Sequence, residues 1–115
     1  MKNIKNLIYF AGIIDGEGCV KPNSRIINGK KYTQAKCTVS NTSLKLMGWL
    51  KKNFGGYIKI AKNQKNRKRK YYWNLRNIEM VNIFPQIIPY LIIKKDEATQ
   101  SLHLIKKFNK LRKHK

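Results

Sequence analysis

Acidic residues are scarce in this chain. Only 5 of its 115 residues are Asp or Glu, against 26 Lys and Arg, and the formal net charge is +21. No acid occurs between Glu17 and Glu79. Such an excess of positive charge is too large for an enzyme of neutral substrates, and it indicates a polyanionic partner. A basic surface that serves only solubility is the alternative that charge alone leaves open.

The chain also has too few cysteines for a disulfide-built fold. Its two, Cys19 and Cys37, are expected on opposite faces of one hairpin, so we predict no bridge between them and a reducing compartment. Neither has a second Cys or a His at the spacing of metal ligands.

Long apolar runs are absent as well. None approaches the ~20 residues that cross a bilayer, and the first residues lead directly into a helical pattern, so we expect no membrane partner and no signal peptide. Lys, Asn and Ile, which have A/T-rich codons, are abundant. We therefore expect a protein that is not secreted and that belongs to an organelle (mitochondrion or chloroplast, organelle-encoded) or to a phage or bacterial cytoplasm.

The stretch Y-F-A-G-I-I-D-G-E-G, from Tyr9 to Gly18, joins an apolar helical pattern to an abrupt polar end. Two glycines flank an acid there, and glycine commonly ends a helix. We predict a helix over 2–15 with Glu17 just beyond its end. A carboxylate beside the negative pole of a helix is unfavourable, and a bound cation would relieve that conflict.

The nine residues F-A-G-I-I-D-G-E-G resemble the signature of the LAGLIDADG homing endonucleases. The departures are mild: Phe10 and Ile13 stand at Leu positions, Gly16 at an Ala position and Glu17 at an Asp position. Glu in place of Asp keeps the carboxylate but moves it one methylene outward. An ordinary capped core helix is the alternative for these residues taken alone.

A helix that is apolar around most of its circumference must be covered on two sides. Its own domain covers one side, and the chain has no second copy of the motif, so we predict a homodimer with this helix at the two-fold axis. The predicted dimer interface comprises Phe10, Ala11, Gly12, Ile14 and Asp15, with Asp15 capping backbone groups where the two helices meet. A helix buried wholly within its own domain is the alternative.

The remaining chain alternates hairpins and helices. Asn28-Gly29 is a strong turn signal, and Pro85 predicts a break or kink near Phe84. The expected elements are hairpins over 18–41 and 57–76 and helices over 43–53, 79–90 and 96–111. We predict an α+β fold in a single domain, 1–109, followed by a basic tail, 110–115. The order matches the αββαββα core of the resembled family, which implies an antiparallel, saddle-shaped sheet with helices on one face.

The period-2 pattern of the hairpins predicts one apolar and one basic sheet face. Polar and cationic side chains of the basic face suit phosphates and base edges in the DNA major groove. The predicted DNA-binding residues are Lys21, Asn23, Arg25, Tyr32, Gln34, Lys36, Thr38, Lys59, Arg67, Arg69, Tyr72, Asn74 and Arg76.

The resemblance also implies a catalytic site. Glu17 would be the metal-binding carboxylate, with Mg²⁺ (or Mn²⁺) as cofactor. V-S-N-T at 39–42 resembles the family's strand-to-helix junction and puts Asn41 in the role of positioning metal-bound water. P-Y-L-I-I-K-K at 89–95 resembles the connector that carries the active-site lysine, which falls on Lys94, with Lys95 less favoured.

The function so implied is a site-specific endonuclease of double-stranded DNA that makes a double-strand break in a long pseudo-palindromic target during intron or element homing. Two alternatives stay open. One is a maturase that binds intron RNA, and the other is a DNA-binding protein that keeps the fold without cutting.

Overall fold

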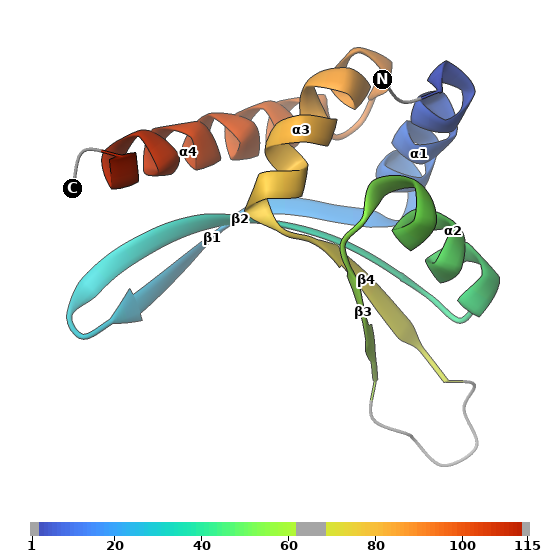
Figure 1. The fold of residues 1–115 in the computed structure, drawn as a ribbon, viewed down its shortest axis with the longest axis horizontal. Coiled ribbons are helices and arrows are strands. Elements are labelled where there is room, and N and C mark those ends of the chain that lie inside the picture. Colours follow the sequence, from blue (N-terminus) through green and yellow to red (C-terminus); the bar gives the residue numbers. More distant parts are fainter. Residues whose placement is uncertain (1–2, 62–68, 114–115) are drawn as a thin grey trace.

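The computed structural model describes residues 3–61 and 69–113, with the backbone alone described at 23–25, 27, 31–33 and 108–113. Its elements follow the predicted order (Figure 1). They are α1 (Ile4–Glu17), β1 (Gly18–Ile27), β2 (Lys30–Asn41), α2 (Leu44–Phe54), β3 (Tyr57–Ile60), β4 (Tyr71–Leu75), α3 (Asn77–Ile87), the 3-10 helix η1 (Ile88–Tyr90) and α4 (Lys95–Lys113). The predicted α+β class is confirmed.

The two hairpins form one antiparallel sheet with the strand order β1-β2-β4-β3. Asn28 and Gly29 both have positive φ, 51° and 79°, as a type I′ turn requires. Directly opposed residues project to the same face of a sheet. Cys19 lies opposite Thr38, whereas Cys37 lies one register step further on, so the two thiols are on opposite faces as predicted.

The helices cover one face of the curved sheet and leave the other face open (Figure 1). The core lies between these layers. Phe10 of α1 stacks on Phe54 of α2 at a ring-centroid distance of 4.2 Å and meets Trp73 of β4 edge-on at 5.6 Å. The indole N–H of Trp73 donates to the carbonyl of Gly55 at 2.8 Å, so its burial leaves no polar atom of the ring unpaired.

Helix α1 continues two residues beyond its predicted end, through Gly16 to Glu17. The chain leaves the helix at Gly18 with a φ of −80°, which is not the left-handed conformation. Glycine is needed at that position for a different reason, because a Cβ there would lie 2.8 Å from the backbone of Ile14. Glu17 is therefore the last residue of α1 and does not lie beyond it.

Of the predicted break or kink near Phe84, the break is wrong. Helix α3 runs through Pro85 to Ile87 before the chain tightens into η1. Pro85 is exposed, whereas Ile83, Phe84 and Ile87 are buried. Their packing into the core holds the helix together despite the missing N–H of the proline.

The last helix is longer than predicted. Helix α4 continues to Lys113, so residues 110–113 of the predicted tail are helical. Among the described residues, no helix combines the length and the apolar character that a membrane crossing needs.

Candidate functional site

Glu17 and Asn41 meet where α1 and β2 both end. Asn41 Nδ2 donates to Glu17 Oε2 at 3.0 Å. The other amide atom, Asn41 Oδ1, accepts from the backbone N–H of Ser43 at 2.8 Å. That N–H fixes the orientation of the amide, so Asn41 presents a donor to the carboxylate. Glu17 itself is exposed. Asn41 thus orients an accessible carboxylate that lies 24 positions away in the sequence.

Lys94 reaches the same helix end from the connector between η1 and α4. Its Nζ donates to the carbonyl oxygens of Ile14 at 2.8 Å and Asp15 at 3.1 Å. These carbonyls belong to the last turn of α1, where a cation is favourable because the helix dipole is negative there. The chain itself therefore places a cation beside the pole at which Glu17 lies. Lys95, the less favoured candidate, is exposed.

Both carboxylate oxygens of Asp15 accept hydrogen bonds from within the chain. Oδ2 accepts from the N–H of Ile92 at 2.8 Å, and Oδ1 accepts from the N–H groups of Ile93 at 3.2 Å and Lys94 at 3.0 Å. Burial acts to raise the pKa of Asp15, but these N–H donors and the charge of Lys94 outweigh it, so the pKa lies below the ordinary value of 3.8. Asp15 thus caps backbone groups at this end of α1, and those groups belong to the connector of its own chain, whereas the meeting of two helices there stays a prediction.

Three of the predicted dimer residues are unavailable to a partner. Phe10, Ala11 and Ile14 are 0%, 1% and 0% exposed and pack into the core of their own chain. Their assignment to the dimer interface is therefore wrong. Together with Leu7 they occupy the helical spacing i, i+3, i+4, i+7, which is the face that α1 turns toward its own domain.

The opposite side of α1 is uncovered. Its residues recur every fourth position, and we call this set the open stripe: Ile4, Ile8, Gly12 and Gly16. Ile4 and Ile8 are 57% and 49% exposed. A Cβ added at Gly12 or Gly16 would meet nothing within 4 Å. Of the predicted dimer residues, Gly12 lies on this stripe.

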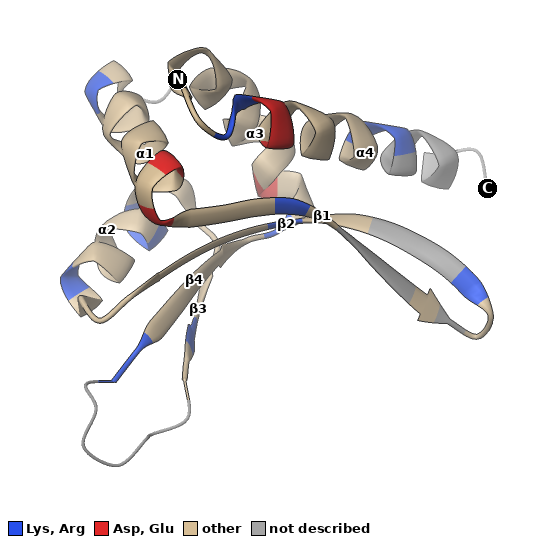
Figure 2. Cartoon of the chain, turned by 180° about the vertical axis from the view of Figure 1, so that it is seen from behind, with Lys and Arg blue, Asp and Glu red and all other residues tan. Residues whose placement is uncertain are grey.

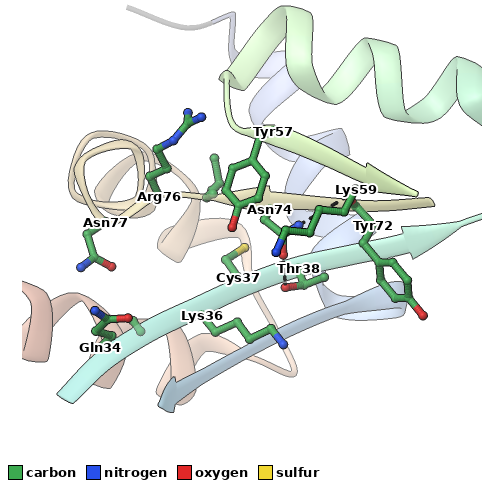
Figure 3. A pocket seen from close by; sticks show the side chains of 12 residues that line it. Gln34, Lys36, Cys37, Thr38, Tyr57, Lys59, Tyr72, Asn74, Arg76 and Asn77 are labelled. Carbon is green, nitrogen blue, oxygen red and sulfur yellow. Dashed lines mark hydrogen bonds between the residues drawn. The ribbon is translucent and has the colours of Figure 1, made fainter. Parts of the chain in front are cut away.

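The open face of the sheet contains a cavity of about 430 Å³ (Figure 3). Seven predicted DNA-binding residues line it: Gln34, Lys36, Thr38, Lys59, Tyr72, Asn74 and Arg76. They come from β2, β3 and the end of β4, which the sheet brings side by side. Tyr57 also lines the cavity and was not predicted. Its position two residues before Lys59 in a strand was the signal that places both on one face.

The other predicted DNA-binding residues divide in two. Lys21 is exposed opposite Lys36, and Arg69 is exposed just before β4. The side chains of Asn23, Arg25 and Tyr32, and the whole of Arg67, lie outside the described residues.

Cations and aromatic rings are interleaved around this cavity. The Arg76 guanidinium lies 5.0 Å from the ring centroid of Tyr57, and Lys59 Nζ lies 5.7 Å from it. At the centre of the face, the Thr38 hydroxyl donates to Asn74 Oδ1 at 2.7 Å. Positive charge and N–H donors therefore dominate the lining, which suits phosphate oxygens and the acceptor atoms of base edges.

All five acids of the chain lie in helices, and none lies in a strand (Figure 2). Glu79 accepts backbone N–H groups on both oxygens and so has a structural role. Asp96 and Glu97 are exposed in the first turn of α4. Asp15 is occupied by the connector, which leaves Glu17 as the accessible acid at the end of α1.

Within the described residues, no three His, Cys, Asp or Glu side chains lie close enough together to hold a metal. Glu17 Oε1 has no hydrogen-bond partner in that part of the chain, and carboxylate oxygen is a ligand that Mg²⁺ prefers. Among the described residues, the end of α1 therefore offers a metal ion this one free carboxylate oxygen.

No protein-family model and no curated protein matches this chain. Solved structures do match it. The homing endonuclease I-CvuI, in complex with the I-CreI target, aligns with a TM-score of 0.73 and 19% identity over 90% of this chain and 67% of its own. The archaeal intron-encoded homing endonuclease I-Vdi141I, complexed with DNA, gives 0.75 and 15% over 92% and 70%. The meganuclease I-SmaMI, bound to DNA, gives 0.76 and 17% over 96% and 39%.

The chain therefore has the fold of DNA-bound endonucleases. More particularly, it has the LAGLIDADG homing endonuclease fold, as the nine-residue resemblance implied, and I-GzeII of that named family also matches it at a TM-score of 0.74. It spans about two thirds of the I-CvuI chain and about two fifths of the I-SmaMI chain.

Proposed function

We propose that this protein is a homodimeric, divalent-metal-dependent endonuclease that binds a long pseudo-palindromic DNA site and cuts both strands. The observation that carries the proposal is the position of Glu17. It is an exposed carboxylate, oriented by Asn41 at 3.0 Å, at the junction between the open stripe of α1 and a sheet whose strands contain no acid.

DNA binding rests on the basic sheet face. Its cavity is lined from three strands by Lys36, Lys59 and Arg76 beside amide and tyrosine side chains. A B-DNA major groove is about 12 Å wide and accepts a two-stranded ribbon. The matched structures of I-CvuI, I-Vdi141I and I-SmaMI are complexes with DNA, which is the ligand that we propose for this chain.

Dimer formation rests on the open stripe. Two exposed isoleucines and two glycines give α1 an apolar, close-approach surface, and a helix at a two-fold axis meets its own copy. This chain aligns with 39% of the I-SmaMI chain, so that longer chain has room for a second unit of the same size. Two copies of α1 would bring two Glu17 carboxylates to one site under one DNA duplex.

Mg²⁺ or Mn²⁺ would be held by Glu17 of each subunit together with phosphate oxygens. When bound, such an ion supplies Lewis-acid stabilisation of the phosphate charge and lowers the pKa of a bound water. The chain contributes the oriented carboxylate through Asn41 and a fixed positive charge through Lys94. I-CvuI was solved with target DNA in the presence of Mg or Ca.

A role in mobility of an intron or similar element, in an organelle, phage or bacterium, follows from the same proposal. Such an enzyme cuts the allele that lacks its own element, so the expected target is the uninterrupted sequence at the insertion site of the gene.

The test uses supercoiled plasmid carrying that uninterrupted sequence, incubated with Mg²⁺. We compare the wild type, Glu17→Gln and the matched control Glu97→Gln, which removes an equal charge from an exposed site on α4. Wild type and control should yield linear DNA, and Glu17→Gln should bind in Ca²⁺ but not cut. Cleavage by Glu17→Gln at the wild-type rate would show that Glu17 has no role in catalysis. Binding without cutting by the wild type would support the non-cleaving alternative.

A further inference from the structure

The connector between η1 and α4 is held by one side chain from the far end of the sequence. Leu91 is 2% exposed and anchors the start of the connector, and Ala98 at 0% anchors the helix that follows. Between them, Ile92 and Ile93 are 87% and 69% exposed, so their side chains contribute little packing. What fixes these residues is the carboxylate of Asp15, which accepts three successive backbone N–H groups at 2.8–3.2 Å.

The contact also runs in the opposite direction. Lys94, whose N–H is bound by Asp15 Oδ1, returns its side chain to the carbonyl oxygens of Ile14 and Asp15. Residues 14–15 and 92–94 are therefore joined by five hydrogen bonds across a separation of 77 to 80 positions. A lysine ammonium on a flexible four-carbon stem is otherwise free to adopt many positions. Here its backbone and its side chain are both fixed to the last turn of α1.

We propose that Asp15 is a positioning residue that acts through Lys94, by holding the 92–94 backbone so that the ammonium lies on the last turn of α1, the helix that ends at Glu17. This inference rests on the proposed nuclease function. In the proposed reaction Asp15 does not contact the DNA. Its carboxylate sets where the Lys94 charge lies relative to the Glu17 carboxylate, two residues along the same helix.

A merely structural role for Asp15 makes a different prediction. If Asp15 only stabilised the fold, its loss would add to the loss of Lys94. If Asp15 acts through Lys94, the loss of Asp15 should have no further effect on the cleavage rate once the ammonium is absent. The free-energy effects of two residues that act as one unit are non-additive, and this difference can be measured.

The experiment measures single-turnover cleavage rates and DNA affinity in Ca²⁺ for the wild type, Asp15→Ala, Asp15→Asn, Lys94→Gln and the double variant Asp15→Ala/Lys94→Gln. Asp15→Ala should slow cleavage by roughly 10–100-fold, since a misplacement of about 1 Å can have an effect of that order. Affinity should stay within about twofold, because the sheet face is untouched. The double variant should be no slower than Lys94→Gln, and Asp15→Asn, which keeps one accepting oxygen, should be intermediate.

The matched control is Asp96→Asn, which removes the same charge from an exposed position in the first turn of α4. It should cleave at the wild-type rate. Multiplying rate losses in the double variant, or an Asp15→Ala enzyme as fast as wild type, would overturn the proposal.

A second readout does not depend on cleavage. Amide hydrogen exchange in the wild type should show protection at Ile92, Ile93 and Lys94 despite their exposed side chains, and Lys94→Gln should keep most of it. Rapid exchange at these amides in the wild type would refute the positioning role. If the wild type shows protected amides but does not cut DNA, the nuclease proposal fails, and the positioning role of Asp15 fails with it. If the wild type cuts DNA but these amides are not protected, only the positioning role fails.

Discussion

The open sheet face and the end of α1 differ in how firmly their charged side chains are held in place. On the sheet face, cationic side chains lie on tyrosine rings at 5.0–5.7 Å and make few directed bonds. At the end of α1, hydrogen bonds of 2.8–3.2 Å join Asn41 to Glu17 and, separately, Asp15 to the connector that carries Lys94. The first arrangement suits many weak, adaptable contacts to a polyanion. The second fixes a few groups in place, as chemistry on a single phosphodiester would require.

The largest expected effect concerns the sheet face. If a dimer neutralises roughly 6–10 phosphates, its DNA affinity should fall by about 10³–10⁵ between 50 and 200 mM salt. Fluorescence anisotropy with a labelled duplex measures this slope. The cleavage step, followed with bound DNA, should depend far less on salt because its groups are fixed within the protein. An affinity that hardly changes over this range would contradict the phosphate-contact role of the face.

Glu17→Gln should act only on the end of α1. Cleavage should fall by at least about 10²-fold, since a charge that stabilises a reacting phosphate commonly contributes that much. Affinity in Ca²⁺ should change by less than about tenfold, because the carboxylate lies outside the cavity lining. A parallel loss of affinity and rate would mean that the two regions are not separable.

The open stripe can be tested with two glycines that have equally free surroundings. A Cβ at Gly12 in α1 or at Gly48 in α2 would meet nothing within 4 Å. Both substitutions by Gln should stabilise their helix by up to ~1 kcal/mol. Only Gly12→Gln should raise the dimer dissociation constant, by about 10-fold or more, because a long side chain blocks helix contact. Analytical ultracentrifugation of both variants decides, and equal behaviour would place the dimer surface elsewhere.

A subtler effect is expected where Thr38 meets Asn74. Thr38→Val removes the hydroxyl that engages Asn74 Oδ1 at 2.7 Å and should cost about 1 kcal/mol in stability. It should also change base preference at one position in each half-site, because the freed amide can rotate. Selection from a randomised duplex library measures the preference. Thr99→Val, which loses a 2.7 Å bond to the Lys95 carbonyl on an exposed helix, is the control and should leave the preference unchanged.

The smallest effect concerns the reactivity of the two cysteine thiols, which lie on opposite faces of the sheet. Burial raises the pKa of Cys37 to about 12, whereas Cys19 is exposed on the open face. At pH 8 the Cys37 thiolate fraction is about 10⁻⁴, so a thiol reagent should label Cys19 alone in the native protein. Bound DNA should slow that labelling. Labelling of both thiols at the same rate would contradict the predicted division of faces.

Much of the fold could be predicted from local pattern. Alternation with period 2 placed Gln34, Lys36 and Thr38 together on one face, and the Asn28-Gly29 turn fixed the register of the first hairpin. The resemblance in turn pointed to Glu17, Asn41 and Lys94, which the structure brings to one helix end. The predictions of elements and sheet faces are confirmed because they depend on strand periodicity and turn geometry that few residues encode, whereas the roles of Glu17, Asn41 and Lys94 stay predictions.

The failures concern sides of helices and distant partners. Apolar residues surround most of α1, so the sequence could not say that Phe10 and Ile14 face the core while Ile8 and Gly12 face outward. The backbone groups that Asp15 caps could not be predicted, because the three donors lie 77 to 79 positions away. The persistence of α3 through Pro85 depends on core packing that no local rule contains.

The amino-acid sequence by itself determined the order of elements, the alternation of faces and the strong positive charge, because backbone propensity, side-chain period and ionisation are local properties. Tertiary structure alone decided which side of α1 is open and which backbone groups Asp15 binds. Both depend on how the sheet, α1 and the connector pack together, and packing is a property of surfaces that the chain assembles only on folding.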